Sequence, residues 1–426
     1  MKNSILKPVV ISALVATLVQ ASGYRVPESS LNSTALSAAY VAHAHGADAA
    51  YYNPANMAFN GQNCNRIEGG LTYINLGKIN YTDSRGAHLN ASSKEENLFA
   101  PSFFFSSQDY NGMRYGFSMT VPGGLTKRWD SPFAKLFAEE FTLKIIELNP
   151  VAAYKVNENF AIGGGLRLIY SEGIVKSDGM PITIATAGFP APAQIKKPAA
   201  RDMEADTIEF GYNVAATFKP DSALTIAATY RSNVDVNEEG NAKLFLSGTK
   251  LYDGGASVEV PLPAVAALAV SYDFGATVLE LVYDKTFWSE YKTLDFAFTD
   301  TVPLALRAAF DAPKPREWKD TNAFRVGISH DVNKKLTLMG GFAIDENPAP
   351  EANVGFELPD SDAKLYSGGF RYHYSDALSF GASVLYDSKE SRRVQTALKE
   401  DGKRDIDGTF KDASALLVTT GISYKF

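Results

Sequence analysis

The sequence LSFGASVLYD, residues 378–387, places an apolar or aromatic side chain at every second position and mostly small or polar residues between them. Since successive side chains of a β-strand point to opposite faces of the sheet, this period of two predicts a strand with one apolar face. The same alternation recurs in the residue ranges 207–218, 336–345 and 416–426. These stretches predict an all-β protein.

The connections between the predicted strands alternate in length. Short polar turns are predicted in the residue ranges 108–112, 157–159, 220–222, 273–275, 331–334 and 375–377. Longer stretches lie between them, in the residue ranges 125–142, 176–205, 237–254, 290–320, 346–362 and 389–411. Short turns on one rim and long loops on the other, with Tyr and Phe near strand ends, are typical of an outer-membrane barrel whose short rim faces the periplasm.

We therefore predict a transmembrane barrel of about fourteen antiparallel strands in up-and-down order, located in the cell outer membrane. A large soluble β-sandwich would show the same alternation, but it would not need the long and short rhythm of the connections. The aromatic Phe426 ends the last strand and resembles the signal that the barrel-assembly machinery recognises. We expect that machinery and outer-membrane lipid to be partners.

Composition excludes several classes of protein. The chain has 426 residues, 45% of them hydrophobic, which excludes a disordered chain. One cysteine excludes a disulfide scaffold, and 41 Lys and Arg against 48 Asp and Glu argue against nucleic-acid binding. Beyond residue 21 no window approaches the ~20 apolar residues of a membrane-spanning helix.

The first residues predict a secretory signal peptide. Lys2 and Lys7 form a basic start, residues 9–19 form an apolar run, and cleavage is expected after Ala21. The alternative is an uncleaved anchor, although the apolar run is too short to span a membrane. We assign residues 1–21 to the signal peptide.

Residues 22–63 do not alternate. Small residues recur there at helical spacing, which favours a short helix. A barrel of about fourteen strands is too wide for its own side chains to fill. We therefore predict that residues 22–63 form a hatch that plugs the lumen and that residues 64–426 form the barrel.

An ordered set of short motifs runs along the chain. Asp48 is followed by YYNPA at residues 51–55. The later motifs are VPGGL at 121–125, AATYRS at 227–232, WKDT at 318–321, RVG at 325–327, DENPAP at 345–350 and LPDSD at 358–362. Together they resemble the FadL family of outer-membrane channels for long-chain fatty acids and other hydrophobic compounds, in which the first motif is similar to the N-terminal hatch and the others follow in this order. The resemblance implies passive uptake of long-chain fatty acids or similar hydrophobic compounds. Aromatic or aliphatic hydrocarbons are the alternative cargo.

Capture of an apolar cargo needs an apolar surface on the loops. Ser131-Pro132 resembles a helix start, after which Phe133, Phe137 and Phe141 fall on one predicted helical face together with Leu136. A second predicted segment opens at residues 301–303 and carries Leu306, Ala309 and Phe310. Family members are similar in having a hydrophobic groove on their loops. The alternative, that these faces only pack on other loops, stays open.

Charged residues share the inward parity of the strands. The inward arginines are Arg114, Arg167, Arg231, Arg325 and Arg371, and the inward acids include Glu147, Glu209, Glu280 and Asp345. A guanidinium suits a cargo carboxylate, but we favour a structural lattice of ion pairs for any single arginine. The resemblance implies ligand contacts near Lys319 and Asp345. The ligand-binding candidates in the lumen are Tyr24, Arg167, Lys319, Arg325 and Asp345.

The exit is predicted at Pro122, Gly123 and Gly124. Proline lacks a ladder donor and glycine permits a bend, and in the family such a kink resembles a lateral opening from the lumen to the bilayer. A plain bulge is the alternative. Cargo contact near Tyr24 and the Asn53-Pro54-Ala55 turn would shift the plug, so this turn is the predicted gate.

Catalysis is not expected. The chain has five histidines and no HExxH or GxSxG pattern. His43 and His45 could both touch a metal, but they have no evident third ligand. We expect no cofactor and no metal. An outer-membrane enzyme and a purely structural barrel are the less favoured alternatives.

Overall fold

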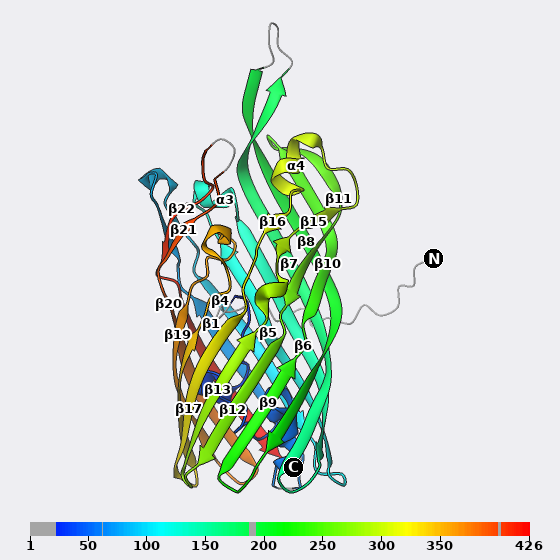
Figure 1. Ribbon diagram of the computed structural model, residues 1–426, viewed down its shortest axis with the longest axis vertical. Coiled ribbons are helices and arrows are strands. Elements are labelled where there is room, and N and C mark those ends of the chain that lie inside the picture. The colour runs from blue at the N-terminus through cyan, green and yellow to red at the C-terminus, as the bar shows by residue number, and fades with distance from the viewer. Residues whose placement is uncertain (1–22, 62, 187–192, 399–401) are drawn as a thin grey trace, which may run out of the picture.

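The computed structural model describes residues 23–61, 63–186, 193–398 and 402–426. The predicted signal peptide lies outside these residues. The described chain forms one antiparallel sheet that closes on itself, because the first and last strands pair from Arg66↔Lys425 to Leu76↔Ala415 (Figure 1). Closure removes the sheet edges, which lipid would leave without hydrogen-bond partners.

Fourteen spans form the wall in the described residues. Their strands are β1 (Arg66–Leu76), β4 (Glu96–Ser106), β5 (Met113–Arg128), β6 (Glu140–Lys155), β7 (Phe160–Thr186), β8 (Ala193–Phe218), β9 (Leu224–Arg231), β10 (Val234–Leu246), β11 (Thr249–Leu262), β12 (Val265–Asp273), β13 (Thr277–Thr286), β17 (Thr321–Asn333), β18 (Leu336–Asp345), β19 (Ala363–His373), β20 (Leu378–Lys389) and β23 (Ser414–Lys425). The strands β9 and β10 are two parts of one span, because both pair with β8. The strands β11 and β12 likewise form one span. The predicted fold class is confirmed.

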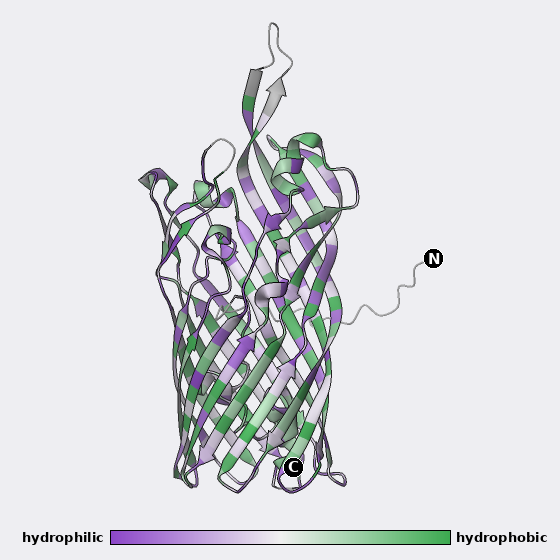
Figure 2. Ribbon diagram, in the orientation of Figure 1, coloured by the Kyte–Doolittle hydropathy of each residue, from purple (hydrophilic) through white to green (hydrophobic). Residues whose placement is uncertain are grey.

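Alternation separates two environments across the wall. On β8 the outward Phe210 is 69% exposed, whereas the inward Asn213 is 3% exposed. The strand that the sequence LSFGASVLYD predicts behaves in the same way, with Tyr386 outside and Asp387 buried inside. Green apolar segments mark the lower wall in Figure 2. An apolar outer face with a polar lumen is what a lipid-embedded barrel requires.

The two rims differ as predicted. Short turns close the end near the C-terminus, at the bottom of Figure 1, and the long loops extend from the other end. The loop elements are β2 (Asn80–Asp83), η2 (Ala87–Leu89), β3 (Ala91–Ser92), α3 (Pro132–Lys135), η3 (Trp288–Glu290), β14 (Thr293–Leu294), β15 (Phe296–Phe298), α4 (Leu304–Phe310), β16 (Lys314–Pro315), η4 (Glu351–Asn353), β21 (Arg392–Gln395) and β22 (Asp407–Lys411). None of the helices in the described part of the chain has the length and apolar character needed to span a membrane.

Two predicted loops are strands instead. Within residues 176–205, β7 and β8 stay paired out to Thr186↔Ala193, and they form the tall green hairpin of Figure 1. Residues 237–254 hold the ends of β10 and β11, joined at Ser247 and Gly248, which both have positive φ. Above the bilayer the outer face of a strand meets water and carries Lys and Glu. The apolar alternation that identifies a strand in lipid is therefore lost there.

The hatch occupies the lumen of the barrel. It contains α1 (Leu31–Ala35), α2 (Ala49–Tyr52) and η1 (Pro54–Phe59), whose residues are almost all buried. The hydroxyl of Ser30 caps α1 by accepting from the N–H of Ser33. The helix α1 contacts β18, β19, β20 and β23, while η1 contacts β5 to β8. The hatch therefore touches opposite parts of the wall.

Candidate functional site

The Asn53-Pro54-Ala55 turn is fastened to the wall of the barrel. Asn53 donates from Nδ2 to Thr217 Oγ1 of β8 at 2.9 Å and to the carbonyl of Val41 at 3.0 Å. Thr217 in turn donates to Asn56 Oδ1 at 2.7 Å. All these groups are buried, so the hydrogen bonds between hatch and wall satisfy polar atoms that would otherwise have no partner.

A glycine of the wall makes room for the same turn. A Cβ placed at Gly163 of β7 would lie 2.6 Å from the backbone nitrogen of Ala55 and 2.7 Å from the carbonyl carbon of Pro54. Such distances are closer than van der Waals contact. Hatch and wall are therefore in backbone contact at the predicted gate.

The inward arginines form a lattice of ion pairs. Arg325 donates from Nε to Asp284 at 2.6 Å and from Nη2 to Asp345 at 3.0 Å. Its third nitrogen donates to the carbonyl of Ser37 in the hatch at 3.2 Å. Arg325 and Asp345, both ligand-binding candidates, therefore satisfy each other and the hatch.

Arg167 takes part in a second cluster of the same kind. It donates to Glu147 at 3.0 Å and to the carbonyl of Ser232 at 2.6 Å. Arg231 also pairs with Glu147, and its guanidinium lies 4.3 Å from the ring centroid of Tyr51 in the hatch. Arg114 and Arg371 likewise bond to hatch groups. Ion pairs as the sequence analysis favoured are present at Arg167, Arg231, Arg325 and Arg371, whereas Arg114 donates to the carbonyls of Ser107 and Asn60.

A small cavity lies between hatch and wall at the middle of the barrel. Its volume is about 70 Å³. The hatch lines it with Val26 and Tyr51, and the wall lines it with Pro122, Arg167 and Arg231. Two of the predicted site residues, Arg167 and Pro122 of the kink, therefore line the same cavity.

The hydrogen-bond ladder between β4 and β5 is incomplete. It stops at the pair Phe103↔Met119, although β4 begins at Glu96 and β5 continues to Arg128. Arg128 donates from Nε to Glu96 Oε1 at 2.9 Å, which joins the two strands again at their extracellular ends. Between these two contacts the wall has a break.

The predicted kink lies at this break. On its other side β5 pairs with β6, and the register between those strands shifts between Thr120 and Gly123. Pro122 lies within the shift and has no N–H to donate. The ladder between β5 and β6 is therefore interrupted at the same place where β5 no longer pairs with β4 on its other edge.

The main chain of residues 24–26 covers the break from inside. Val26 donates its N–H to the carbonyl of Pro122 at 2.8 Å, and Gly124 donates to the carbonyl of Tyr24 at 2.7 Å. The hatch thus pairs with β5 as a short strand. Removing this segment would leave the backbone groups of the kink without partners.

Tyr24 enters an aromatic cluster under the loops. Its ring lies 4.8 Å from that of Trp288 and 5.9 Å from that of Trp318, and Tyr291 completes the cluster. The hydroxyl of Tyr24 donates to the carbonyl of Pro261. Nε1 of Trp288 and Nε1 of Trp318 are buried without a hydrogen-bond partner among the described residues. The N-terminal end of the hatch therefore fills an aromatic pocket.

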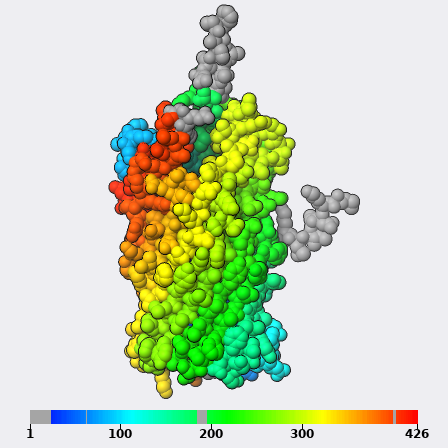
Figure 3. Space-filling model, in the orientation of Figure 1, coloured from blue at the N-terminus to red at the C-terminus, as the bar shows by residue number. Residues whose placement is uncertain are grey.

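A much larger groove of about 950 Å³ lies among the extracellular loops. Figure 3 shows a hollow at this end, between the yellow lobe that contains α4 and the red lobe that contains β21 and β22. The apolar lining consists of Phe133, Leu136, Phe137, Met180, Pro181, Ile182, Leu304, Ala305, Ala308 and Ala309. Its volume is within the range of small-molecule pockets.

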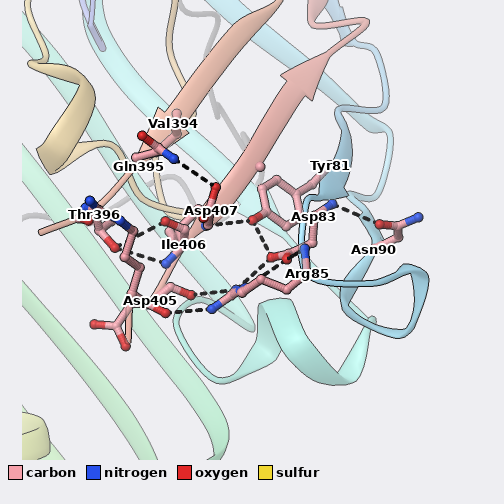
Figure 4. A network of polar contacts seen from close by, with 12 residues as sticks. Tyr81, Asp83, Arg85, Asn90, Val394, Gln395, Thr396, Asp405, Ile406 and Asp407 are labelled. Atoms are coloured by element: carbon pink, nitrogen blue, oxygen red, sulfur yellow. Dashed lines mark hydrogen bonds and ion pairs between the residues drawn. The ribbon is translucent and has the colours of Figure 1, made fainter. Parts of the chain in front are cut away.

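One wall of the groove is braced by the network in Figure 4, which joins the four-stranded sheet of β21, β22, β2 and β3 to the neighbouring loop. Arg85 donates to Asp83 from Nε at 2.8 Å and to the carbonyl of Arg404 at 2.6 Å. Its guanidinium also lies 5.5 Å from the ring centroid of Phe133. Arg85 thus connects three segments that surround the groove.

Three predicted site residues lie elsewhere than expected. The helix α3 ends at Lys135, so Phe141 lies in β6 and does not line the groove. Lys319 is exposed just before β17, and its side chain lines none of the cavities described above. On α4, which begins directly after Pro303, the predicted Phe310 packs into the core together with Leu306, while Leu304 faces the groove.

Sequence reasoning missed a lysine that lines the groove together with Arg85, Arg404 and Asp405. Lys314 lines it and is half-buried. Burial, followed by the nearby charge of Arg201, lowers the pKa of Lys314 to about 8. Alternate residues of a strand face inward, so Arg201 would have been predicted to face inward if residues 176–205 had been recognised as strands.

Comparisons with known proteins agree with this architecture. A family model described as "Outer membrane protein transport protein (OMPP1/FadL/TodX)" matches residues 12–426. The 47 kDa outer membrane protein of Pasteurella multocida is 27% identical over 97% of this chain and 96% of its own. The long-chain fatty acid transport protein of Escherichia coli K12 is 23% identical over 93% of this chain and 95% of its own. Outer membrane protein P1 of Haemophilus influenzae is 24% identical over 68% of this chain, and the match spans 65% of that protein.

Solved structures share the fold. A FadL homologue of Pseudomonas aeruginosa superposes with a TM-score of 0.83 at 20% identity, over 95% of this chain and 99% of that one. The toluene transporter TodX of P. putida superposes with a TM-score of 0.70 at 17% identity, over 96% of this chain and 99% of that one. Both are barrels to which this one is similar.

Proposed function

Because this chain belongs to the outer membrane protein transport family of OMPP1, FadL and TodX, we propose that it mediates passive uptake of long-chain fatty acids or similar hydrophobic compounds. Members of this family are transport channels of the outer membrane. The finer statements, namely the cargo and the route, are argued here from the geometry.

A plugged lumen is unsuited to aqueous diffusion. The hatch fills the barrel and is bonded to the wall by Asn53, Glu280 and Arg325 among others. A hydrocarbon chain would in any case lose roughly 0.8 kcal/mol for each CH₂ exposed to water. A route for such a cargo therefore keeps it against apolar surface from capture to release.

The observation that carries the proposal is the break between β4 and β5. It interrupts the hydrogen-bonded wall that separates the lumen from lipid, and residues 24–26 of the hatch pair with β5 beside it. A cargo that displaced this short segment would leave the lumen sideways and enter the bilayer directly. Such an exit avoids the periplasm, where an acyl chain is poorly solvated.

The groove and the aromatic cluster supply the earlier steps of the route. In this proposal Phe133 and Phe137 capture the cargo at the loops, and the cargo then competes with Tyr24 for the aromatic pocket. Ligand binding there would favour hatch conformations in which residues 24–26 leave β5. This is a shift in population and needs no energy source.

Aromatic or aliphatic hydrocarbons are the second candidate cargo, since this barrel is also similar to a toluene transporter. An apolar groove and an aromatic pocket would accept either class. Uptake measurements with one compound of each class distinguish the two candidate cargoes. In cells that lack their own fatty-acid transporter, expression of this chain should raise the initial rate of radiolabelled palmitate uptake above the empty-vector control. A rise for toluene alone would favour the second cargo, and a rise for neither would contradict the proposed function.

A further inference from the structure

Positive charge near the groove exceeds the negative charge that pairs with it. Arg85 is paired with Asp83, and Arg316 is paired with Glu357 at 2.7 Å. Arg404, on the groove wall, donates to the carbonyl of Thr396. These side chains have protein partners, and two other cations of the same region do not.

Arg201 is the first cation that makes no direct ion pair within the described residues, although the charge of Glu357 acts on it. Its side chain lies on the inward face of β8, and the residue is 5% exposed. Nε and Nη1 are buried and have no hydrogen-bond partner among the described residues. The guanidinium stacks 4.7 Å from the ring centroid of Phe296 and 5.6 Å from that of Phe310, at the end of α4. A buried charge without a partner is costly unless a ligand completes its site.

Lys314 is the second. It follows α4 by four residues and lines the groove beside Leu304 and Ala308. Among the described residues its ammonium makes no hydrogen bond or ion pair. Lys314 thus presents three unused donors to the groove. The charges of Arg201 and Arg316 act on it, opposed by those of Glu357 and of Asp405, which also lines the groove.

An apolar groove with an unpaired ammonium on its wall is complementary to an amphiphile with an anionic head. The acyl chain would lie along Phe133, Phe137 and Met180, and a carboxylate would pair with Lys314. A neutral hydrocarbon would gain only the apolar contacts and would leave the ammonium of Lys314 without a bonded partner. Charge complementarity therefore favours one class of occupant.

We propose that Lys314, supported by the positive charge of Arg201, binds the head group of the cargo, so that the groove selects long-chain carboxylates over neutral compounds of equal length. This inference rests on the proposed role of the groove in capture. It assigns a specificity-determining residue outside the buried lattice of Arg167, Arg325 and Asp345.

The test compares two probes that share one chain length. Equilibrium binding of radiolabelled palmitate and of 1-hexadecanol is measured on the purified protein in a non-ionic detergent, for the wild type and for Lys314→Met. Methionine keeps the apolar stem and removes the charge. Lys314→Arg keeps the charge, and Lys292→Met removes an exposed lysine of the same loop that does not line the groove. Heat-modifiable gel mobility verifies that each variant is folded.

We expect Lys314→Met to weaken palmitate binding roughly tenfold, as for the loss of one hydrogen bond between charged groups. Binding of 1-hexadecanol should stay within about twofold. The Lys314→Arg and Lys292→Met variants should bind palmitate like the wild type. Unchanged palmitate binding in Lys314→Met, or an equal loss for both probes, would overturn the inference. If the wild type binds neither probe, the proposed function itself fails.

Discussion

The carboxylate of Glu280, on β13, accepts a hydrogen bond from the backbone N–H of Val41 in the hatch at 2.7 Å. The same carboxylate accepts from the N–H groups of Ala42 at 2.6 Å and His43 at 2.9 Å. One wall side chain thus satisfies three consecutive main-chain donors of the hatch. The contact consists of three hydrogen bonds to one carboxylate, so a single substitution in the wall tests how firmly it holds the hatch.

Replacing Glu280 with Gln should loosen this part of the hatch. The amide has only one acceptor oxygen, and its NH₂ group would face a backbone N–H. The expected loss is about 2 kcal/mol of local stability, because hydrogen bonds to charged groups contribute roughly that much. Hydrogen exchange at residues 41–43 should become about thirtyfold faster while exchange in β13 stays unchanged. Equal protection in the variant would show that Glu280 does not hold the hatch.

Arg325→Met tests whether the predicted ligand-binding arginine is structural. The substitution removes the cation that bonds to the buried Asp284 and Asp345, and it leaves Asp284 only the longer contact with Arg25 at 3.8 Å. Breaking a buried ion pair in this way costs roughly 3–5 kcal/mol. The variant should lose its heat-modifiable gel mobility at a lower temperature than the wild type. A variant of wild-type stability with weaker palmitate binding would instead support a ligand role for Arg325.

Phe133→Ser with Phe137→Ser tests the groove as the capture surface. Each phenylalanine would contribute about 1.5–3 kcal/mol if its ring is fully covered by cargo. We expect the double variant to need at least about tenfold more palmitate for half-maximal uptake. Leu398→Ser is the matched control, because Leu398 is an exposed apolar residue of the neighbouring loop that does not line the groove. Unchanged uptake at low palmitate concentration would remove the groove from the route.

Palmitate binding should depend on pH through Lys314. Burial lowers the pKa of this residue to about 8, with Arg201 and Arg316 opposed by Glu357 and Asp405 as the surrounding charges. The ammonium is present below this pKa and is lost above it. A bound carboxylate stabilises the ammonium and so raises the pKa of Lys314 in the complex above that of the free protein. Affinity for palmitate should therefore fall as the pH rises above about 8, while 1-hexadecanol binding stays constant. Lys314→Arg should remove the dependence.

The barrel could be predicted from the sequence because lipid imposes one pattern on each strand. The stretch 378–387 identified its own strand and both of its faces. The hairpin of β7 and β8 could not be found in this way, because above the bilayer both of its faces carry polar residues. Arg201 was missed with it, since parity has meaning only once a strand is recognised.

The functional residues were predicted unevenly for a similar reason. Phe133 lies in α3 and Phe137 in the turn that follows it, where its N–H donates to the carbonyl of Ala134 at 3.0 Å, so both line the groove, whereas Phe141 already lies in β6. Whether Arg325 bonds to a ligand or to Asp284 depends on contacts between strands that are distant in the chain. Local sequence patterns do not contain that information.

The exit between β4 and β5 is the central claim, and a reversible lock tests it most directly. Arg25 and Gly123 lie opposite each other in an antiparallel β-bridge. They form a non-hydrogen-bonded pair, in which the two Cα atoms are about 4.5 Å apart. A Cβ at position 123 would lie 2.9 Å from the carbonyl oxygen of Tyr24, so the main chain there must shift slightly. Cysteines at these two positions, with Cys64→Ser, should then form a disulfide that ties the hatch to the kink.

Palmitate uptake by the Arg25→Cys/Gly123→Cys variant is measured before and after reduction, with disulfide formation quantified by mass spectrometry. Ser37→Cys/Ser367→Cys serves as the matched lock away from the break, since these two hydroxyl oxygens lie 2.8 Å apart between hatch and wall. The account predicts that uptake stops in the oxidised Arg25–Gly123 variant and returns when the disulfide is reduced. Undiminished uptake with the disulfide fully formed would contradict it.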